Sequence, residues 1–253
     1  WQLNRTGQIE CCFVTCSYAR DANNTDMLQD VATLARNNPS FRYFVFTNLK
    51  DLNAPGWIPI TKNLDGLTRM ITKSRYGKFL AWKDALLTNC EVVFYLDGWY
   101  TIHKSSVTYR RIANEVKSHP SGMGQYLHPS EGGITREMEK IVRLRKDTAE
   151  NMNKTIAWLK QQPDFSENCT LYTNYAFAYS IESSSFQKSS QFFWETYSTE
   201  DASWRDQPLW CYVLDHLNVT PMKLTTNLFQ PAFERMGHAG HKYTSRNSKP
   251  INV

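Results

Sequence analysis

The first hundred residues alternate short apolar runs with amphipathic stretches. Apolar runs occupy residues 9–16 ("IECCFVTC"), 41–47 ("FRYFVFT") and 91–96 ("EVVFYL"). Apolar residues at helical spacing lie at about 27–37 and again in "YGKFLAWKDALL". Continuous apolar runs are typical of strands buried on both faces. The strand–helix–strand order therefore predicts an α/β fold with a mostly parallel central sheet flanked by helices.

The pattern changes in the second half of the chain. Helical spacing runs from about 135 to 160, a strand-like segment covers 169–181, and "SSSFQKSSQFFWETY" and "QPLWCYVLDHL" predict two further helices. The final stretch, "MGHAGHKYTSRNSKPINV", is polar and is expected to be a flexible tail. We expect one domain over residues 1–253, in which the first hundred residues form a binding scaffold and the rest line the substrate site.

Composition narrows the class of protein. With 253 residues, 41% hydrophobic and 21% charged, the chain can bury a sizeable core, and no apolar run approaches the ~18 residues of a membrane span. The net charge is +5, but the basic residues are spread along the chain. The densest cluster, "REMEKIVRLRK", alternates with glutamates and indicates a solvated helix face. We therefore expect no nucleic-acid partner and no membrane span in this chain.

Six cysteines show no C-x-x-C pair, which argues against a structural zinc site. Cys11, Cys12 and Cys16 lie in an apolar strand, where buried free thiols are the favoured interpretation. A disulfide between Cys169 and Cys211 is an alternative if the compartment is oxidising.

Two features bear on localisation. The chain begins at Trp1 without a methionine, so a signal or anchor could have been removed. Acceptor patterns for N-glycosylation, which favour a secretory lumen mildly, begin at Asn4, Asn23, Asn153, Asn168 and Asn218.

The turn "DGWY" carries the first candidate for chemistry. Asp97 directly follows the buried run 91–96. Ligands bind at the carboxyl ends of parallel strands, where a carboxylate could hold a divalent cation or a ribose hydroxyl. The alternative is structural, because Asp-Gly favours tight turns.

Cations cluster just upstream of this strand. Arg75, Lys78 and Lys83 are expected about the start of a helix, where positive charge is misplaced unless it serves an anion such as phosphate. The alternative is that they are solvated surface residues.

Two later motifs are also ambiguous. In "WRDQP", Asp206 precedes Pro208, which suits a carboxylate that caps a helix. It also suits a carboxylate held rigidly as a general base or hydroxyl ligand. In "GHAGH", His238 and His241 could reach a metal, or could belong to an inert tail.

In combination these motifs resemble a known family. The order "YGKFLAWKDALLTNCEVVFYLDG", "FFWETYSTEDASWRDQPLWCYVL" and "HKYTSR", over roughly residues 9–243, is similar to the TOD/MUCI-type glycosyltransferases of plants and their relatives. The resemblance implies a Rossmann-like domain of glycosyltransferase-A type. Residues 1–100 would then bind a nucleotide-sugar donor, and residues 101–253 would bind a glycan or glycoconjugate acceptor and include the C-terminal tail.

The resemblance also implies roles for individual residues. Asp97 matches the first acid of an Asp-x-Asp motif, but Trp99 stands at the second acid position. Either a late histidine would then complete the sphere of Mn²⁺ or Mg²⁺, or metal dependence would be weak. The expected sets are as follows: catalytic Asp206 and Glu195; donor-binding Thr15, Ser17, Tyr18, Arg75, Lys78, Asp97 and Gly98; acceptor- or sugar-binding Trp99, Asn174, Trp194, Arg205 and Gln207; metal-binding Asp97, His238 and His241.

The implied function is transfer of a hexosyl or pentosyl group from a UDP-linked donor to a hydroxyl, assisted by a divalent metal. If the reaction inverts, Asp206 or Glu195 would be the base. The alternative is a nucleotide- or carbohydrate-binding module of the same fold that has lost catalysis. A transferase of this kind is expected in the lumen of the secretory pathway (Golgi) if an N-terminal anchor was removed, and the cytoplasm is the alternative left open.

Overall fold

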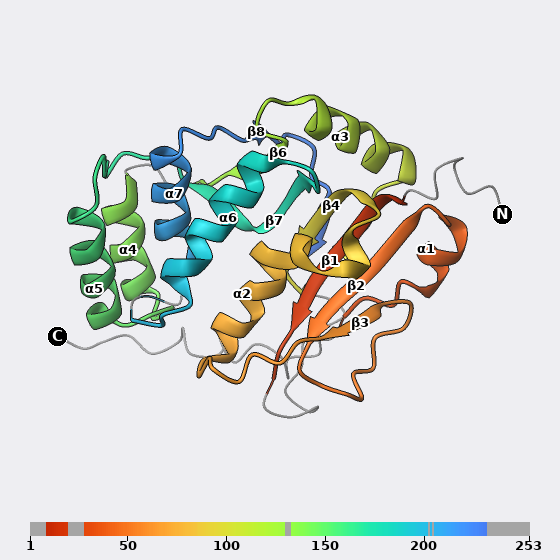
Figure 1. Ribbon diagram of the computed structural model, residues 1–253, viewed down its shortest axis with the longest axis horizontal. Coiled ribbons are helices and arrows are strands. Elements are labelled where there is room, and N and C mark those ends of the chain that lie inside the picture. The colour runs from red at the N-terminus through yellow and green to blue at the C-terminus, as the bar shows by residue number, and fades with distance from the viewer. Residues whose placement is uncertain (1–8, 20–27, 130–132, 202, 204, 232–253) are drawn as a thin grey trace, which may run out of the picture.

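A computed structural model of the chain describes residues 9–19, 28–129, 133–201, 203 and 205–231 (Figure 1). The elements in chain order are β1 (Ile9–Ser17), α1 (Ala32–Asn37), β2 (Phe41–Thr47), β3 (Ile58–Thr61), α2 (Met70–Leu80), two short 3-10 turns (Ala81–Lys83 and Ala85–Leu87), β4 (Cys90–Leu96), β5 (Tyr100–Ile102), α3 (Ser106–Ser118), β6 (Met123–Leu127), α4 (Gly133–Arg143), α5 (Ala149–Lys160), β7 (Tyr172–Ser180), α6 (Ser184–Tyr197), α7 (Asp206–His216), β8 (Met222–Lys223) and β9 (Phe229–Pro231).

The central sheet has the strand order β3-β2-β1-β4-β7-β6-β8. Strands β1, β2, β3 and β4 are mutually parallel, and β6 is parallel to β8. Strand β7 is antiparallel to both of its neighbours, β4 and β6. A separate antiparallel pair joins β5 to β9. The predicted α/β fold, with a mostly parallel central sheet flanked by helices, is confirmed.

Helices cover both faces of this sheet. Figure 1 shows α2, α6 and α7 side by side in front of the sheet, with α4 and α5 beyond α7, and these helices contact one another in that sequence. The opposite face carries α3, which contacts β1, β4, β6 and β7. Each face has its own buried apolar cluster. Residues at the ends of β1 and β4 therefore lie between two packed layers.

Aromatic rings fix the helices on the sheet. On the α3 face, Phe13 of β1 packs edge-on against Tyr109 of α3, with ring centroids 4.9 Å apart. On the other face, the ring centroid of Phe79 of α2 lies 4.2 Å from that of Phe193 of α6 and 4.9 Å from that of Trp210 of α7. These contacts join α2, α6 and α7 into one layer, so side chains on α2 and α7 are held in a fixed relation.

Some element boundaries differ from the sequence-based expectation. The helix expected at 27–37 begins at Ala32, whose backbone N–H donates to the Asp30 side chain at 2.9 Å. The helix expected over 135–160 is two helices. Between them Arg145 has φ 53°, and the side chain of Thr148 caps α5 by accepting from the N–H of Asn151. Hydrophobic spacing did not reveal this break because both helices bury the same kind of apolar stripe.

The cysteines are partly paired. Cys169 and Cys211 form a disulfide, which was the alternative expected for an oxidising compartment. Cys12 forms a second disulfide with Cys90, so the prediction of a free thiol at Cys12 is wrong. The adjacent parallel strands β1 and β4 bring the two residues together. Cys11 and Cys16 are buried and free, as predicted. Within the described part of the chain, no helix has the length and apolar character needed to cross a membrane.

Candidate functional site at the end of strand β4

Asp97 follows the last residue of β4, and its backbone and its carboxylate make separate contacts. Its backbone N–H donates to the carbonyl of Tyr175 at 2.8 Å, and its carbonyl accepts from the N–H of Tyr100 at 2.9 Å. The "DGWY" segment is therefore a tight turn, with Gly98 buried inside it. These bonds use only the backbone of Asp97, so its carboxylate remains available for other contacts.

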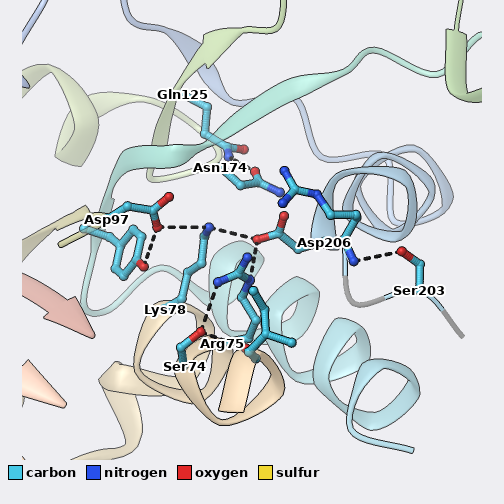
Figure 2. Close-up of polar contacts among 11 residues, drawn as sticks. Ser74, Arg75, Lys78, Asp97, Gln125, Asn174, Ser203 and Asp206 are labelled. Atoms are coloured by element: carbon cyan, nitrogen blue, oxygen red, sulfur yellow. Dashed lines mark hydrogen bonds and ion pairs between the residues drawn. The ribbon is translucent and has the colours of Figure 1, made fainter. Parts of the chain in front are cut away.

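The carboxylate of Asp97 is held from two sides. Tyr95 donates its hydroxyl to Oδ1 at 2.7 Å, and the ammonium of Lys78 lies 3.5 Å from the same oxygen (Figure 2). Burial, followed by the charge of Asp97, raises the pKa of Tyr95 well above its ordinary value, so this hydroxyl stays protonated and donates. The Asp97 side chain is 27% exposed, whereas that of Lys78 is 2% exposed. Asp97 is therefore the member of this pair that a ligand can reach.

Asp206 is the second carboxylate at this position. Its Oδ2 lies 2.8 Å from Lys78 Nζ and 3.0 Å from Arg75 Nε, and both contacts are ion pairs without the alignment of a hydrogen bond. The expectation that Asp206 caps a helix is wrong. The residue at the N-cap of α7 is Arg205, no side chain there makes a capping bond, and Asp206 is the first residue of the helix itself.

Burial and neighbouring charges shift the pKa values of Asp206 and Arg75 in opposite directions. Burial alone would raise the pKa of Asp206, but the charges of Lys78, Arg75 and Arg205 outweigh it and hold the pKa far below its ordinary value. For Arg75, burial would lower the pKa, but the carboxylate of Asp206 outweighs it and raises the pKa above its ordinary value. Asp206 and Arg75 are therefore charged at neutral pH. Counted by formal charge, the three cations Arg75, Lys78 and Arg205 and the two carboxylates Asp97 and Asp206 give the cluster a net charge of +1.

The position of Arg75 and Lys78 on their helix corrects one expectation. Helix α2 begins at Met70, so Arg75 lies in its middle and Lys78 in its last turn rather than at its start. The argument from a helix N-terminus does not apply to them, because the last turn of a helix favours positive charge. Both are buried against α7 instead of being solvated. Lys83 does lie on the surface, where it contacts Gln191.

Gly77 explains how α2 approaches the sheet closely enough to place Lys78. A Cβ atom at position 77 would lie 2.5 Å from Cγ of Phe46 and 2.7 Å from Sγ of Cys16. Only a glycine fits at this contact. The "YGK" motif therefore combines a close approach of the helix with a cation in the next position.

A chain of buried amides leads from α7 to the same edge of the sheet. The indole N–H of Trp210 donates to Gln125 Oε1 at 3.1 Å, and Gln125 Nε2 donates to Asn174 Oδ1 at 3.2 Å. Because an indole can only donate, this chain fixes the orientation of both amides. The Nδ2 donor of Asn174 is buried and makes no hydrogen bond within the described residues. Figure 2 shows Asn174 and Gln125 beside the row Asp97, Lys78 and Asp206.

The residues expected at the end of β1 divide between two faces. Thr15 and Ser17 alternate with Cys16, so they point away from the face that carries α2. Their hydroxyls, and that of Tyr18, are buried without a hydrogen-bond partner in the part of the chain that is described. Cys16 is the β1 residue that faces the charged cluster, and burial raises the pKa of its thiol to about 12. It is therefore neutral and not a nucleophile.

Glu195 is not part of the cluster. It lies two residues before Tyr197, which is buried beside Arg75 and Asp206. Two residues correspond to about 200° around a helix, so Glu195 faces away from the cluster. Its exposed carboxylate accepts from Gln191 at 2.7 Å. Glu195 thus lies apart from Asp206, and its role as the alternative base stays a prediction.

The remaining expected sugar-binding residues lie around the cluster in different settings. Trp99 packs on Tyr100 with ring centroids 4.3 Å apart, and Trp194 packs edge-on against Tyr76 at 5.5 Å. Arg205 is half-buried and adds its charge beside Asp206. Gln207 is half-buried in the first turn of α7.

The described residues do not fit a divalent metal. Such ions require several oxygen or imidazole ligands. Asp97 supplies one carboxylate whose Oδ1 is already shared by Tyr95 and Lys78, and Asp206 uses Oδ2 on two cations. A group of three acidic, histidine or cysteine side chains arranged for a metal does not occur among these residues. His238 and His241 lie outside the described residues, so their predicted role as ligands stays a prediction.

Sequence reasoning missed Tyr95, Gln125, Trp210 and Cys16. Tyr95 lies inside an apolar strand, where an aromatic residue is ordinarily core, and only its spacing of two from Asp97 could have placed both on one side of the sheet. Gln125 and Trp210 are joined across 85 residues, so no local signal identifies them.

No family model matches the chain, and no curated protein matches it. Among solved structures, the chain is similar to core-mannan synthase A (CmsA/Ktr4) from Aspergillus fumigatus, in a form with Mn and GDP. The two are 9% identical, with 81% of this chain and 69% of that chain covered and a TM-score of 0.44.

Proposed function

We propose that the protein is a glycosyltransferase that moves a hexosyl or pentosyl group from a nucleotide-sugar donor, UDP-linked as the resemblance implies, to a hydroxyl of a glycan or glycoconjugate. One observation carries the proposal: Lys78 from α2, Asp97 from the end of β4 and Asp206 from the start of α7 meet at the carboxyl edge of the parallel strands. Ligands of open α/β sheets bind at this edge.

The chemistry of the edge suits such a donor. The net charge of +1 attracts the anionic diphosphate and stabilises the negative charge that develops on it as it leaves. The buried donor of Asn174 and the exposed side of the Asp97 carboxylate supply one donor and one acceptor for sugar or ribose hydroxyls. The hydroxyls of Thr15, Ser17 and Tyr18, after β1, are the candidates for contacts with the nucleoside.

In the reaction the bond between the anomeric carbon and the diphosphate oxygen breaks, and its electron pair leaves with the nucleoside diphosphate. The acceptor hydroxyl attacks the same carbon, and its proton is released. Asp206 is a poor candidate for taking that proton, because Lys78, Arg75 and Arg205 hold its pKa far below its ordinary value. We therefore assign Asp206 the task of holding Arg75 and Lys78 in place. Trp99, Trp194, Arg205 and Gln207 are the candidates for contacts with the acceptor.

The two disulfides support a lumenal location, since disulfides persist in oxidising compartments. Three of the expected glycosylation acceptors, Asn153, Asn168 and Asn218, have exposed positions. A lumen such as the Golgi is thus the compartment we propose.

Incubation of the full chain with a panel of nucleotide sugars and glycan acceptors, followed by measurement of nucleoside diphosphate release, tests the function. We expect acceptor-dependent release with at least one donor, and loss of that release in Asp97→Ala. Binding of a nucleotide without turnover across the panel would favour the non-catalytic module of the same fold. Absence of both binding and turnover would refute the proposal.

A further inference from the structure

Lys78 occupies the position between two carboxylates that a bound cation would otherwise take. Its ammonium lies 2.8 Å from Oδ2 of Asp206 and 3.5 Å from Oδ1 of Asp97. The two acids come from different elements, the end of β4 and the start of α7. Lys78 links them by pairing with both. A protein cation therefore already pairs with both acids at this edge of the sheet.

This ammonium is held firmly in its position. Its side chain is 2% exposed, and the ammonium lies 5.2 Å from the ring of Tyr95 and 5.9 Å from that of Phe79. Such positions over aromatic faces favour a cation. Gly77 lets the preceding turn of α2 contact β1 and β2 directly, so the helix cannot move outward without losing this packing. Lys78 therefore cannot swing away to admit a metal ion without breaking an ion pair with a buried acid.

The oxygens that would hold a divalent ion are also committed. Asp97 Oδ1 accepts the Tyr95 hydroxyl, and Asp206 Oδ2 faces both Lys78 and Arg75. An ion bound at Asp97 would lie close to the Lys78 ammonium, and like charges in a partly buried site repel strongly. A hydroxyl group, which donates a hydrogen bond without adding charge, suits the exposed side of Asp97 better.

We infer that nucleotide binding at this edge is independent of divalent cations, with Lys78 as the built-in cation and Asp97 as an acceptor for a ribose or sugar hydroxyl. The inference rests on the proposed function. It differs from the metal-assisted reaction that the family resemblance implies. In this arrangement Arg75, Lys78 and Arg205 supply the positive charge that the donor diphosphate requires.

The test is nucleotide binding by isothermal titration calorimetry, with UDP, GDP and ADP as probes, in EDTA and in Mn²⁺. For the wild-type full chain we expect the affinity for its nucleotide to differ less than twofold between the two conditions. The double variant His238→Ala/His241→Ala is expected to bind as the wild type does. A wild-type affinity that appears only with Mn²⁺ would overturn the inference while leaving the proposed function intact.

Lys78→Met probes the built-in cation directly. It removes the cation that Asp97 and Asp206 share, so we expect affinity in EDTA to fall at least tenfold and Mn²⁺ to restore much of it, because the ion can take the vacated position. Lys83→Met, which removes the same charge from the surface five residues later, should change affinity less than twofold. Unchanged affinity of Lys78→Met in EDTA would contradict the role of Lys78. If no nucleotide binds to the wild type in either condition, the proposed function fails and the inference with it.

Discussion

Replacing Asp206 by asparagine removes the counter-charge of two buried cations while keeping the shape of the side chain. Asp206 is 3% exposed, and its Oδ2 lies within 3.0 Å of both Arg75 and Lys78. Loss of one partner from a buried ion pair costs about 3–5 kcal/mol. Lys78 keeps Asp97 at 3.5 Å and Arg75 keeps a hydrogen bond to Ser74. We therefore expect the free energy of unfolding to fall by about 3 kcal/mol, the lower end of that range.

The loss of unfolding free energy in Asp206→Asn should become smaller at low pH. The cations hold the pKa of Asp206 below its ordinary value, so its contribution to stability is complete above the pKa of an unfolded aspartate, about 4. As the pH falls below about 4, the unfolded state takes up a proton first and the contribution is progressively lost. The difference between wild type and Asp206→Asn should thus be constant from pH 7 to 5 and smaller at pH 3.

Urea unfolding followed by tryptophan fluorescence, with the disulfides intact, measures this difference at each pH. Asp215→Asn is a matched control, since it makes the same change on an exposed position of the same helix and should alter the free energy of unfolding by less than about 0.5 kcal/mol. A loss of less than about 1 kcal/mol for Asp206→Asn at pH 7 would refute the claim that a buried ion pair holds α2 to α7.

Two further predictions concern stability. Gly77→Ala would place a Cβ 2.5 Å from Cγ of Phe46 and should lower the free energy of unfolding by about 1–3 kcal/mol. Gly66→Ala is the control, because a Cβ there meets nothing within 4 Å and should have little effect. Equal effects of the two changes in the same urea titration would contradict the close approach of α2 to the sheet. Replacing both Cys169 and Cys211 by serine opens a loop with a sequence separation of 42 and should cost about 4 kcal/mol, and a loss below about 1 kcal/mol in urea unfolding would show that this disulfide contributes little.

The sequence predicted those parts of the fold that have a local signal. Strands β1, β2 and β4 and helices α6 and α7 were located because each has a continuous apolar run or a clear apolar stripe. The direction of β7 was not predicted, because strand direction depends on which neighbour it pairs with rather than on its own residues. The pairing of Cys12 with Cys90 was missed for the same reason: it follows from β1 and β4 being neighbours.

The candidate site was predicted at the residues whose chemistry is unusual for their local position. Asp97, directly after a buried strand, and Lys78, among the cations upstream of that strand, were both expected to bind the donor, and both lie in the cluster. The partners that orient them could not be predicted, since Tyr95 and Trp210 are aromatic residues in apolar segments and only the tertiary structure brings their polar atoms to the cluster. Glu195 was misplaced because its position around α6 depends on which helix face is buried.

The structural alternatives for Asp97 and Asp206, a turn and a helix cap, differ in whether they need the side-chain carboxylate. The turn at Asp97 uses the backbone alone, so the carboxylate can serve a ligand while the turn forms. A helix cap would have required the carboxylate of Asp206 itself, and that carboxylate faces Arg75 and Lys78 instead. The cation nearest to Asp97 is that of Lys78, nineteen residues earlier in the chain and 3.5 Å from Oδ1. The cation and the acid are thus encoded in separate motifs, "YGK" and "YLDG", and packing of α2 on the sheet joins them.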